Sequence, residues 1–314
     1  MADPIVYFND KYMPDSEARL PLLTHCLHYG TGVFEGIRGY YDAGAGEIML
    51  FRAKEHFERM AQNVKFLDLH LPLSPDDLMG VAAELVRKNG FTSDVYVRPI
   101  SFKSSNKVGV VLPKEESFAM VVVALGRYLD TQKGLHLGVS SWRRLQDNAI
   151  PGRGKICGGY VNSALAAQEA RDRGFDEAIF LNEDGHVAEG SAMNLFLVRQ
   201  GRLVTPDVSQ GILEGITRET IITLAQDSLG ISTGTRAVDR SELYVADEVF
   251  LCGTAAEVAP AIRIDGRQVG NGQPGRLTLR LQKLYEDVVH GRMTQYRQWL
   301  VPCYHPAARG AGAA

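Results

Sequence analysis

The sequence has few cysteines, no excess of basic residues and no long apolar run. Its four cysteines are scattered through 314 residues without a CxxC pair, which argues against a disulfide framework and the common zinc motifs. Lys and Arg number 34 against 37 Asp and Glu, and this formal charge of −3 argues against a nucleic-acid-binding protein. No apolar run approaches the roughly 18–20 residues of a membrane span, and residues 1–10 do not resemble a signal peptide. We therefore expect a cytoplasmic protein with reduced thiols and neither membrane nor nucleic acid as a partner.

Several familiar active-site motifs are missing as well. No GxxxxGK[ST] loop, no GxGxxG after a strand and no GxSxG elbow occurs, and the eight histidines form neither HxH nor HExxH. We therefore expect no metal site and no nucleotide-binding loop of these kinds.

The composition that remains is typical of a globular protein, with 45% apolar and 23% charged residues. Apolar runs typical of strands outnumber stretches of helical periodicity and follow no regular βαβ rhythm, which predicts an α+β fold. Strands are expected near residues 5–8, 47–51, 95–102, 117–125, 136–142, 177–181 and 248–252, and helices near 53–67, 75–88, 160–173, 216–229 and 275–290.

A polar stretch bounded by glycines, residues 126–134, divides the chain. We expect a smaller α/β domain over residues 1–125, an interdomain linker over 126–134 and a larger domain over 135–300. Residues 301–314 are rich in Pro, Gly and Ala, and we expect them to form a mobile tail.

One lysine stands among glycines, in the segment GRGKICGGY that ends at Tyr160. An ammonium in a tight, partly apolar pocket has a lowered pKa, and the free amine suits Schiff-base chemistry. Most lysines beside glycines are simple loop charges, so Lys155 needs further context.

Three motifs supply that context. Residues 189–196 read EGSAMNLF, residues 203–205 read LVT and residues 213–218 read LEGITR. Their order and spacing closely resemble the signature of class IV pyridoxal-phosphate aminotransferases, and the resemblance extends from Val6 to about Leu300. It implies fold type IV, with two domains, an active site between them, and a homodimer or higher oligomer whose subunits share residues across sites.

The resemblance also implies how pyridoxal 5′-phosphate is bound, chiefly by the larger domain. Lys155 matches the lysine that forms the Schiff base and carries the substrate proton, and Tyr160 matches the tyrosine that bonds the ring oxygen. Glu189 matches the carboxylate that keeps the pyridine nitrogen protonated, so that the ring accepts electrons. Gly215, Ile216 and Thr217 open a predicted helix that can bind the phosphate, and Arg59 and Thr254 match its other contacts.

A substrate pocket is implied by a second set of residues. The segment LHYGTGVFEGIR, residues 27–38, resembles the pocket segment of branched-chain amino-acid aminotransferases, with Phe34 and Gly36 as wall and Tyr29 reaching in from the neighbouring subunit. Strand alternation places Tyr96 and Arg98 on one face, and the resemblance implies that Arg98 pairs with the distal carboxylate of glutamate. The remaining implied contacts are Val108 and Val110 in a loop that crosses to the partner, Tyr128, and the turn of Thr254, Ala255 and Ala256.

These features predict a branched-chain amino-acid aminotransferase. Such an enzyme moves the amino group reversibly from L-leucine, L-isoleucine or L-valine to 2-oxoglutarate by a ping-pong route. The alternative on the same fold is an R-selective amine or D-amino-acid aminotransferase. Tyr96 and Arg98 favour the first, whereas Leu125, where some branched-chain enzymes carry Trp, leaves room for bulkier substrates or amines. A non-catalytic protein of the same fold is disfavoured by the joint presence of Lys155 and Glu189.

Overall fold

The computed structural model describes residues 3–126 and 133–305, and the chain forms two compact units. The first unit contains the residues up to Gly126 together with those from Asp287 onward, and the second extends from Arg127 to Glu286. The sequence analysis placed residues 287–300 in the larger domain, and the structure corrects this. Most of the expected linker, residues 127–132, lies outside the described residues.

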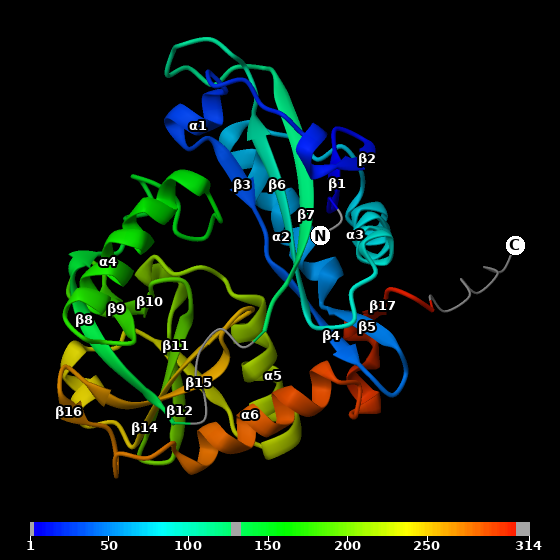
Figure 1. The fold of residues 1–314 in the computed structure, drawn as a ribbon. Helices are drawn as coiled ribbons and strands as arrows, with labels where there is room; N and C mark the ends of the chain where they lie inside the picture. The colour runs from blue at the N-terminus through cyan, green and yellow to red at the C-terminus, as the bar shows by residue number, and fades with distance from the viewer. Residues whose placement is uncertain (1–2, 127–132, 306–314) are drawn as a thin grey trace, which may run out of the picture. The chain divides into compact units, whose positions relative to one another are not determined.

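The first unit contains an antiparallel sheet in the order β17-β5-β4-β6-β7-β1-β2, with β3 paired to β6 (Figure 1). The strand expected near residues 5–8 is confirmed as β1, which forms a hairpin with β2 and opposes Tyr7 to Tyr12. Asn9 and Asp10 turn it with φ of 45° and 65°, as a tight hairpin requires. The strands are β1 Ile5–Phe8, β2 Lys11–Pro14, β3 Gly32–Phe34, β4 Ile37–Asp42, β5 Glu47–Phe51, β6 Val95–Lys103, β7 Glu116–Ala124 and β17 Leu300–Pro302.

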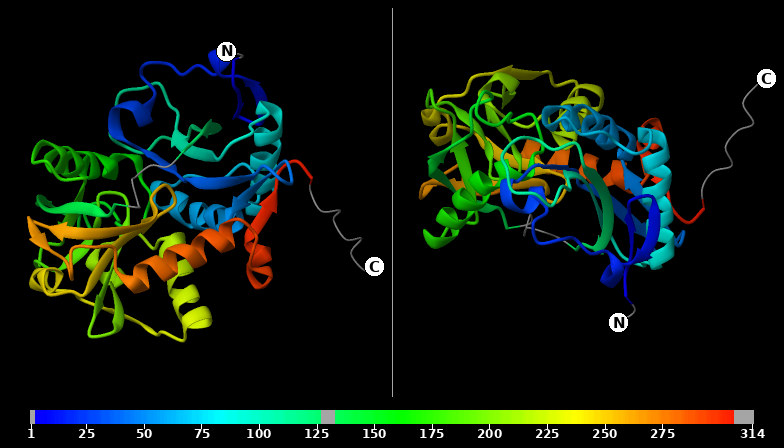
Figure 2. Two further views of the ribbon diagram at one scale, coloured as in Figure 1. Left: turned by 60° about the horizontal axis from the view of Figure 1, so that its bottom comes forward. Right: turned by 90° about the horizontal axis from the view of Figure 1, so that it is seen from above.

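Two helices of this unit follow local signals in the sequence. In α3, Pro75–Asn89, the hydroxyl of Ser74 accepts a hydrogen bond from the N–H of Asp77 at 3.2 Å, and Gly90 ends the helix with φ of 64°. α3 packs against β1 and β7, and α2, Ala53–Asn63, lies beside it (Figure 2). The helix expected over residues 53–67 ends at Asn63 and continues as a 3₁₀ turn. The short elements are α1 His25–Tyr29 and the 3₁₀ turns η1 Asp15–Glu17, η2 Val64–Leu67 and η6 Thr294–Trp299.

The end of the described chain is fastened to the first unit. β17 pairs with β5, and the buried carboxylate of Glu47 accepts hydrogen bonds from the N–H groups of Cys303, Tyr304 and His305 at 2.7–2.9 Å. The expectation of a mobile tail from residue 301 is therefore wrong for residues 301–305, because a buried carboxylate holds them. Residues 306–314 lie outside the described part.

The second unit contains a mixed sheet in the order β10-β9-β8-β15-β14-β11-β12-β13, with β16 paired to β15 (Figure 1). Its strands are β8 Leu135–Arg143, β9 Glu177–Leu181, β10 Val187–Gly190, β11 Asn194–Arg199, β12 Arg202–Pro206, β13 Thr233–Arg236, β14 Glu248–Gly253, β15 Glu257–Ile264 and β16 Arg267–Gln268. Its helices are α4 Tyr160–Asp172, α5 Ile216–Leu229 and α6 Arg276–Val289, the last of which continues into the first unit, and its 3₁₀ turns are η3 Cys157–Gly159, η4 Val208–Gln210 and η5 Arg240–Tyr244.

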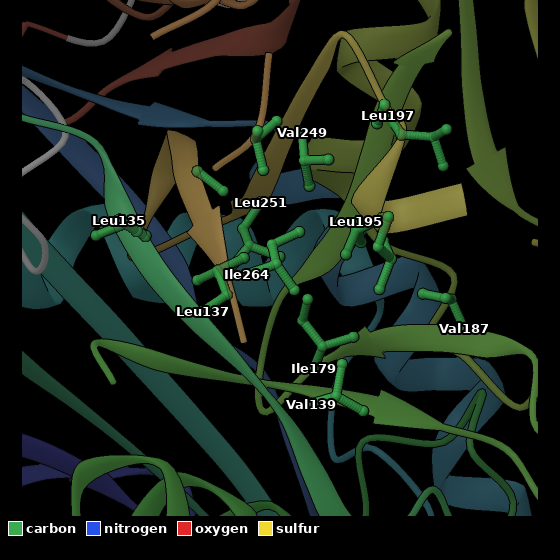
Figure 3. Close-up of a cluster of buried hydrophobic side chains, with 14 of the residues drawn as sticks. Leu135, Leu137, Val139, Ile179, Val187, Leu195, Leu197, Val249, Leu251 and Ile264 are labelled. Carbon is green, nitrogen blue, oxygen red and sulfur yellow. The ribbon is translucent and has the colours of Figure 1, made fainter. Parts of the chain in front are cut away.

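Aliphatic side chains from seven strands of this sheet form a contiguous core, part of which is drawn in Figure 3. Leu137, Ile179, Leu195, Leu251 and Ile264 have no exposed surface, and burying such a side chain contributes about 1.5–3 kcal/mol. A rigid core of this kind fixes the polar residues at the strand ends, where the candidate site lies.

The two sheets and their flanking helices confirm the predicted α+β fold class. None of the helices in residues 3–126 and 133–305 combines the length and the apolar composition needed to cross a bilayer.

Candidate active site

Lys155 lies in the loop between β8 and α4, and its Nζ donates a hydrogen bond to the hydroxyl of Tyr160 over 2.6 Å. Gly152 lets this loop approach the backbone of another segment. A Cβ on Gly152 would lie 2.2 Å from the carbonyl oxygen of Gly211, so glycine is needed for the two backbone segments to approach so closely. The loop therefore holds a half-buried amine and a phenol in contact, next to the segment that leads into α5.

Glu189 of β10 is buried and fully engaged at both carboxylate oxygens. Oε1 lies 3.0 Å from Nη2 of Arg144, while Oε2 accepts hydrogen bonds from Nδ2 of Asn194 at 2.9 Å and from the N–H of Leu213 at 3.2 Å. Burial raises the pKa of Glu189, and Arg144 is the strongest opposing influence, followed by the N–H of Leu213. The site thus contains a desolvated carboxylate with a cation beside it.

The first turn of α5 offers an anion-binding site near this carboxylate. The N–H groups of Ile216 and Thr217 belong to the first turn, where the helix dipole is positive. A Cβ on Gly215 would lie 2.0 Å from Oδ1 of Asn194, and Nδ2 of Asn194 also donates to the carbonyl of Leu213 at 2.9 Å. Asn194 therefore connects Glu189 with the start of α5.

Thr205 and Arg218 connect the LVT and LEGITR motifs. Nε of Arg218 donates to the hydroxyl of Thr205 at 3.2 Å, and its Nη2 donates to the carbonyl of Pro206 at 3.1 Å. Both residues are buried, and burial lowers the pKa of Arg218. This pair fastens the first turn of α5 to β12.

Thr254, Ala255 and Ala256 form the turn between β14 and β15. Strand pairing opposes Cys252 to Asn194, and a Cβ on Gly253 would lie 3.3 Å from Cγ of Met193. The turn is therefore adjacent to the segment that follows Glu189.

In the first unit, Arg59 of α2 is bound by Glu35. Its Nε and Nη2 lie 2.7 and 2.8 Å from the two oxygens of Glu35, and Nδ1 of His56 lies 2.8 Å from one of them. Burial raises the pKa of Glu35, but Arg59 and His56 outweigh it and hold this pKa well below its ordinary value. Arg59 is consequently a mostly buried guanidinium held in a fixed direction.

Replacing Glu35 by Gln is expected to lower the free energy of unfolding at pH 7 by about 3–5 kcal/mol, because Arg59 and His56 lose a fully buried partner. The pKa of Glu35 is lower in the folded state than in the unfolded chain. Its stabilisation is therefore present above the ordinary value of about 4.3 and is lost as the pH falls below it, so the difference between variant and wild type should shrink below about pH 4. Urea unfolding at several pH values measures this.

The matched control removes an exposed ion pair. Asp76→Asn breaks the ion pair between Asp76 and Lys54, whose side chains are 65% and 53% exposed, respectively. Exposed ion pairs contribute only about 0–1 kcal/mol to stability. Equal losses in the two variants would contradict the role given to Glu35.

Phe34, Gly36, Tyr96 and Arg98 gather on one surface of the first unit. Nη2 of Arg98 donates to the hydroxyl of Tyr96 at 3.1 Å, and the guanidinium carbon of Arg98 lies 4.5 Å from the ring centroid of Phe34. A Cβ on Gly36 would lie 1.8 Å from the hydroxyl of Tyr96. An aromatic wall and a cation are thus presented together.

Tyr29 at the end of α1 binds the loop that contains Val108 and Val110. Its hydroxyl accepts a hydrogen bond from the N–H of Gly109 at 3.2 Å, and Nε2 of His25 lies 2.9 Å from the carbonyl oxygen of Gly109. Val108 and Val110 are 81% and 79% exposed. The loop is anchored at its centre and exposes apolar side chains on both sides.

The predicted residues divide between the two units. Lys155, Tyr160, Glu189, Gly215, Ile216, Thr217, Thr254, Ala255 and Ala256 lie in the second unit, and Tyr29, Phe34, Gly36, Arg59, Tyr96, Arg98, Val108 and Val110 in the first, while Tyr128 lies outside the described residues.

Sequence reasoning missed Glu35, His56, Arg144 and Asn194. His56 stands one helical turn before Arg59, and Glu35 stands between two predicted pocket residues, so both carried a local signal. Asn194 lies inside the EGSAMNLF motif. No spacing in the sequence connects Arg144 with Glu189.

The fold and these residues define a class IV aminotransferase. The model of the amino-transferase class IV family matches residues 32–264, and the chain belongs to this family. It is 45% identical to the "probable branched-chain-amino-acid aminotransferase" of Aquifex aeolicus over 95% of this chain and 96% of that protein. These findings confirm the predicted family and enzyme class.

Two solved structures are similar to nearly the whole chain. One is the branched-chain aminotransferase of Thermoproteus uzoniensis with norvaline, with a TM-score of 0.92 and 41% identity over 96% of this chain and 99% of that one. The other is a T.th. branched-chain amino acid aminotransferase complexed with N-(5′-phosphopyridoxyl)-L-glutamate, with a TM-score of 0.90, 41% identity and the same coverage. They confirm the fold predicted from the resemblance.

Proposed function

We propose that this chain is a branched-chain amino-acid aminotransferase that works with pyridoxal 5′-phosphate. It exchanges the amino group between L-leucine, L-isoleucine or L-valine and 2-oxoglutarate in two half-reactions. The observation that carries the proposal is the surface on which Phe34 and Tyr96 lie against Arg98. Such a surface accepts an aliphatic side chain or a second carboxylate. The relatives solved with norvaline and with a phosphopyridoxyl-glutamate adduct support both parts.

The second unit has the donor set that this cofactor needs. When bound, pyridoxal 5′-phosphate supplies an aldehyde and an electron-accepting ring. Lys155 would hold it covalently, Tyr160 would bond the ring oxygen, and the buried carboxylate of Glu189 would face the ring nitrogen. Its phosphate would be held by the N–H groups at Gly215, Ile216 and Thr217 and by Thr254.

Different residues of the chain would then bind the substrate and move its proton. The amine of Lys155, held in place by the hydroxyl of Tyr160, moves the proton at the substrate's α-carbon. N–H groups of Ala255 and Ala256 bind the α-carboxylate, and Phe34 and Gly36 exclude water from the side chain. The same steps run in reverse on the second oxo acid.

A substitution of Arg98 tests whether this residue binds the distal carboxylate of glutamate. Arg98→Ala is expected to raise KM for glutamate and 2-oxoglutarate by roughly 30-fold to several thousand-fold, because losing one partner of a desolvated charge pair costs about 2–5 kcal/mol. KM for leucine should change little, since leucine has no second carboxylate. Steady-state kinetics with both substrates measure the difference.

Arg98→Lys is the control for charge, and it should recover part of the affinity for glutamate. A uniform loss for leucine and glutamate would mean that Arg98 acts only on the structure. Retained selectivity for glutamate in Arg98→Ala would mean that another group binds its distal carboxylate.

A half-reaction followed by cofactor absorbance tests the function as a whole. We expect conversion with L-leucine, L-isoleucine, L-valine and L-glutamate and little with D-alanine or R-amines. Faster conversion of D-amino acids or R-amines would replace the proposal by the alternative on the same fold.

We also propose a homodimer or higher homo-oligomer that works in the cytoplasm. The exposed apolar side chains of Leu22, Val108 and Val110 support a contact between subunits. In that contact, Tyr29 and the loop that contains Val108 and Val110 would reach the partner's active site. All four cysteines are free thiols, which supports a reducing compartment. Light scattering should give at least twice the chain mass of 34.5 kDa.

A further inference from the structure

Arg144 has no part in the function proposed above, yet it is fixed from three directions. Its Nη2 lies 3.0 Å from Oε1 of Glu189, and its Nε donates to the carbonyl of Gly211 at 3.1 Å. Its own N–H donates to the carbonyl of Leu181, at the end of β9, at 2.9 Å. The side chain is 11% exposed, so this guanidinium is mostly buried as well as hydrogen-bonded.

The carbonyl that Arg144 binds is the one that approaches the Lys155 loop. The oxygen of Gly211 is the atom that a Cβ on Gly152 would meet at 2.2 Å. A single guanidinium thus joins Glu189 to the backbone on which the loop of Lys155 rests.

The titratable groups of the described residues that interact electrostatically with Glu189 include two arginines, a lysine and a thiol. Arg144 follows β8, Lys155 lies before α4, Arg218 lies in α5 and Cys252 in β14. Burial raises the pKa of the Cys252 thiol to about 12, so this group is neutral. The Arg218 guanidinium donates hydrogen bonds to Thr205 and Pro206, whereas the Arg144 guanidinium is in direct contact with the carboxylate of Glu189.

We propose that Arg144 is the positioning residue of Glu189, which fixes the carboxylate and preserves its negative charge inside the protein. The inference rests on the proposed function, because it takes Glu189 to face the ring nitrogen of the cofactor. Asn194 and Leu213 hold one carboxylate oxygen in place, and Arg144 supplies the charge at the other. Arg144 thereby sets the lowest pH at which the site works.

Arg144→Met in the full-length holoenzyme tests the proposal. An opposite charge at this distance lowers a carboxyl pKa by about 1–3 units. Without Arg144, the acid limb of the pH profile of kcat/KM for L-leucine should therefore move to higher pH by about 1–3 units. The Kd of pyridoxal 5′-phosphate should rise about tenfold or more at pH 6 and far less at pH 9. Fluorescence titration measures Kd independently of turnover.

Four further variants separate the effect of the charge from the effect of packing. Arg144→Lys keeps the cation and should restore most of the acid limb, and Arg143→Met changes the exposed neighbouring arginine and should leave the limb unmoved. If Arg144→Met does not fold, Arg144→Gln removes the charge while keeping a donor for Gly211, and it carries the same expectation. In a Glu189→Gln background, Arg144→Met should shift nothing further, since no carboxyl remains to titrate.

Two results would overturn the proposal. One is a loss of kcat/KM that is equal at all pH values, with the Kd changed equally at pH 6 and pH 9, because that is the signature of lost packing. The other is a shift of the acid limb that persists in the Glu189→Gln background. Failure of the proposed function would be distinct, since the wild type would then not convert branched-chain amino acids while its cofactor Kd could still be measured.

Discussion

Lys155→Ala is expected to abolish transamination, with a fall in turnover of at least about 10⁴-fold. Proton transfer by a positioned side chain alone contributes about 10²–10⁴-fold, and this variant also loses the covalent link to the cofactor. The hydroxyl of Tyr160, 2.6 Å away in the wild type, cannot replace an amine. The absorbance band of covalently bound cofactor should disappear together with the turnover of leucine and 2-oxoglutarate.

Lys155→Arg is the matched control for charge. It keeps a cation and a donor toward Tyr160, but a guanidinium stays protonated and is not a nucleophile, so we expect it to be inactive as well. Near-wild-type turnover in either variant would contradict the proposed mechanism, provided that circular dichroism shows both to be folded.

Glu189→Gln is expected to leave the cofactor bound and to slow the half-reaction with leucine by about 10²–10³-fold. This is the range for removing one preorganised electrostatic group from an active site. A neutral amide cannot keep the ring nitrogen protonated, so electrons from the substrate carbon lose their acceptor. The substitution also leaves Arg144 without its carboxylate partner. Single-turnover absorbance traces measure the rate.

Glu177→Gln is the matched control, because Glu177 is a buried carboxyl of the neighbouring strand β9 whose oxygen accepts hydrogen bonds from the N–H groups of Ala178 and Ser191. Burial raises the pKa of Glu177 as it does that of Glu189, but no contact with the cofactor or the substrate is proposed for Glu177. We expect an unchanged rate in this variant. An unchanged rate in Glu189→Gln would remove Glu189 from the proposed mechanism.

Elements set by neighbouring residues could be predicted from the sequence. The hairpin at Asn9 and Asp10, the start of α3 at Ser74 and the start of α5 after Gly215 all depend on signals within a few residues. The family signature likewise lies in short motifs, and it identified the family before the fold was described. Shared faces along one strand, such as that of Tyr96 and Arg98, follow from the alternation of side chains.

Contacts between residues far apart in the chain could not be predicted in this way. The tail was expected to be mobile because it is rich in Pro, Gly and Ala, whereas Glu47 binds three consecutive N–H groups of residues 303–305. Arg59 resembles a solvated helix charge in the sequence, but the buried Glu35 holds it.

The sequence by itself determined the local elements and the chemical types at the site: an amine among glycines, a carboxylate in a strand and a glycine before a helix. Only the tertiary structure decided which charges meet, as Arg144 meets Glu189 and Arg59 meets Glu35. The physical reason is that helix and strand signals depend on neighbours in the chain. The state of a buried charge instead depends on desolvation and on the partner that folding brings within about 3 Å of it.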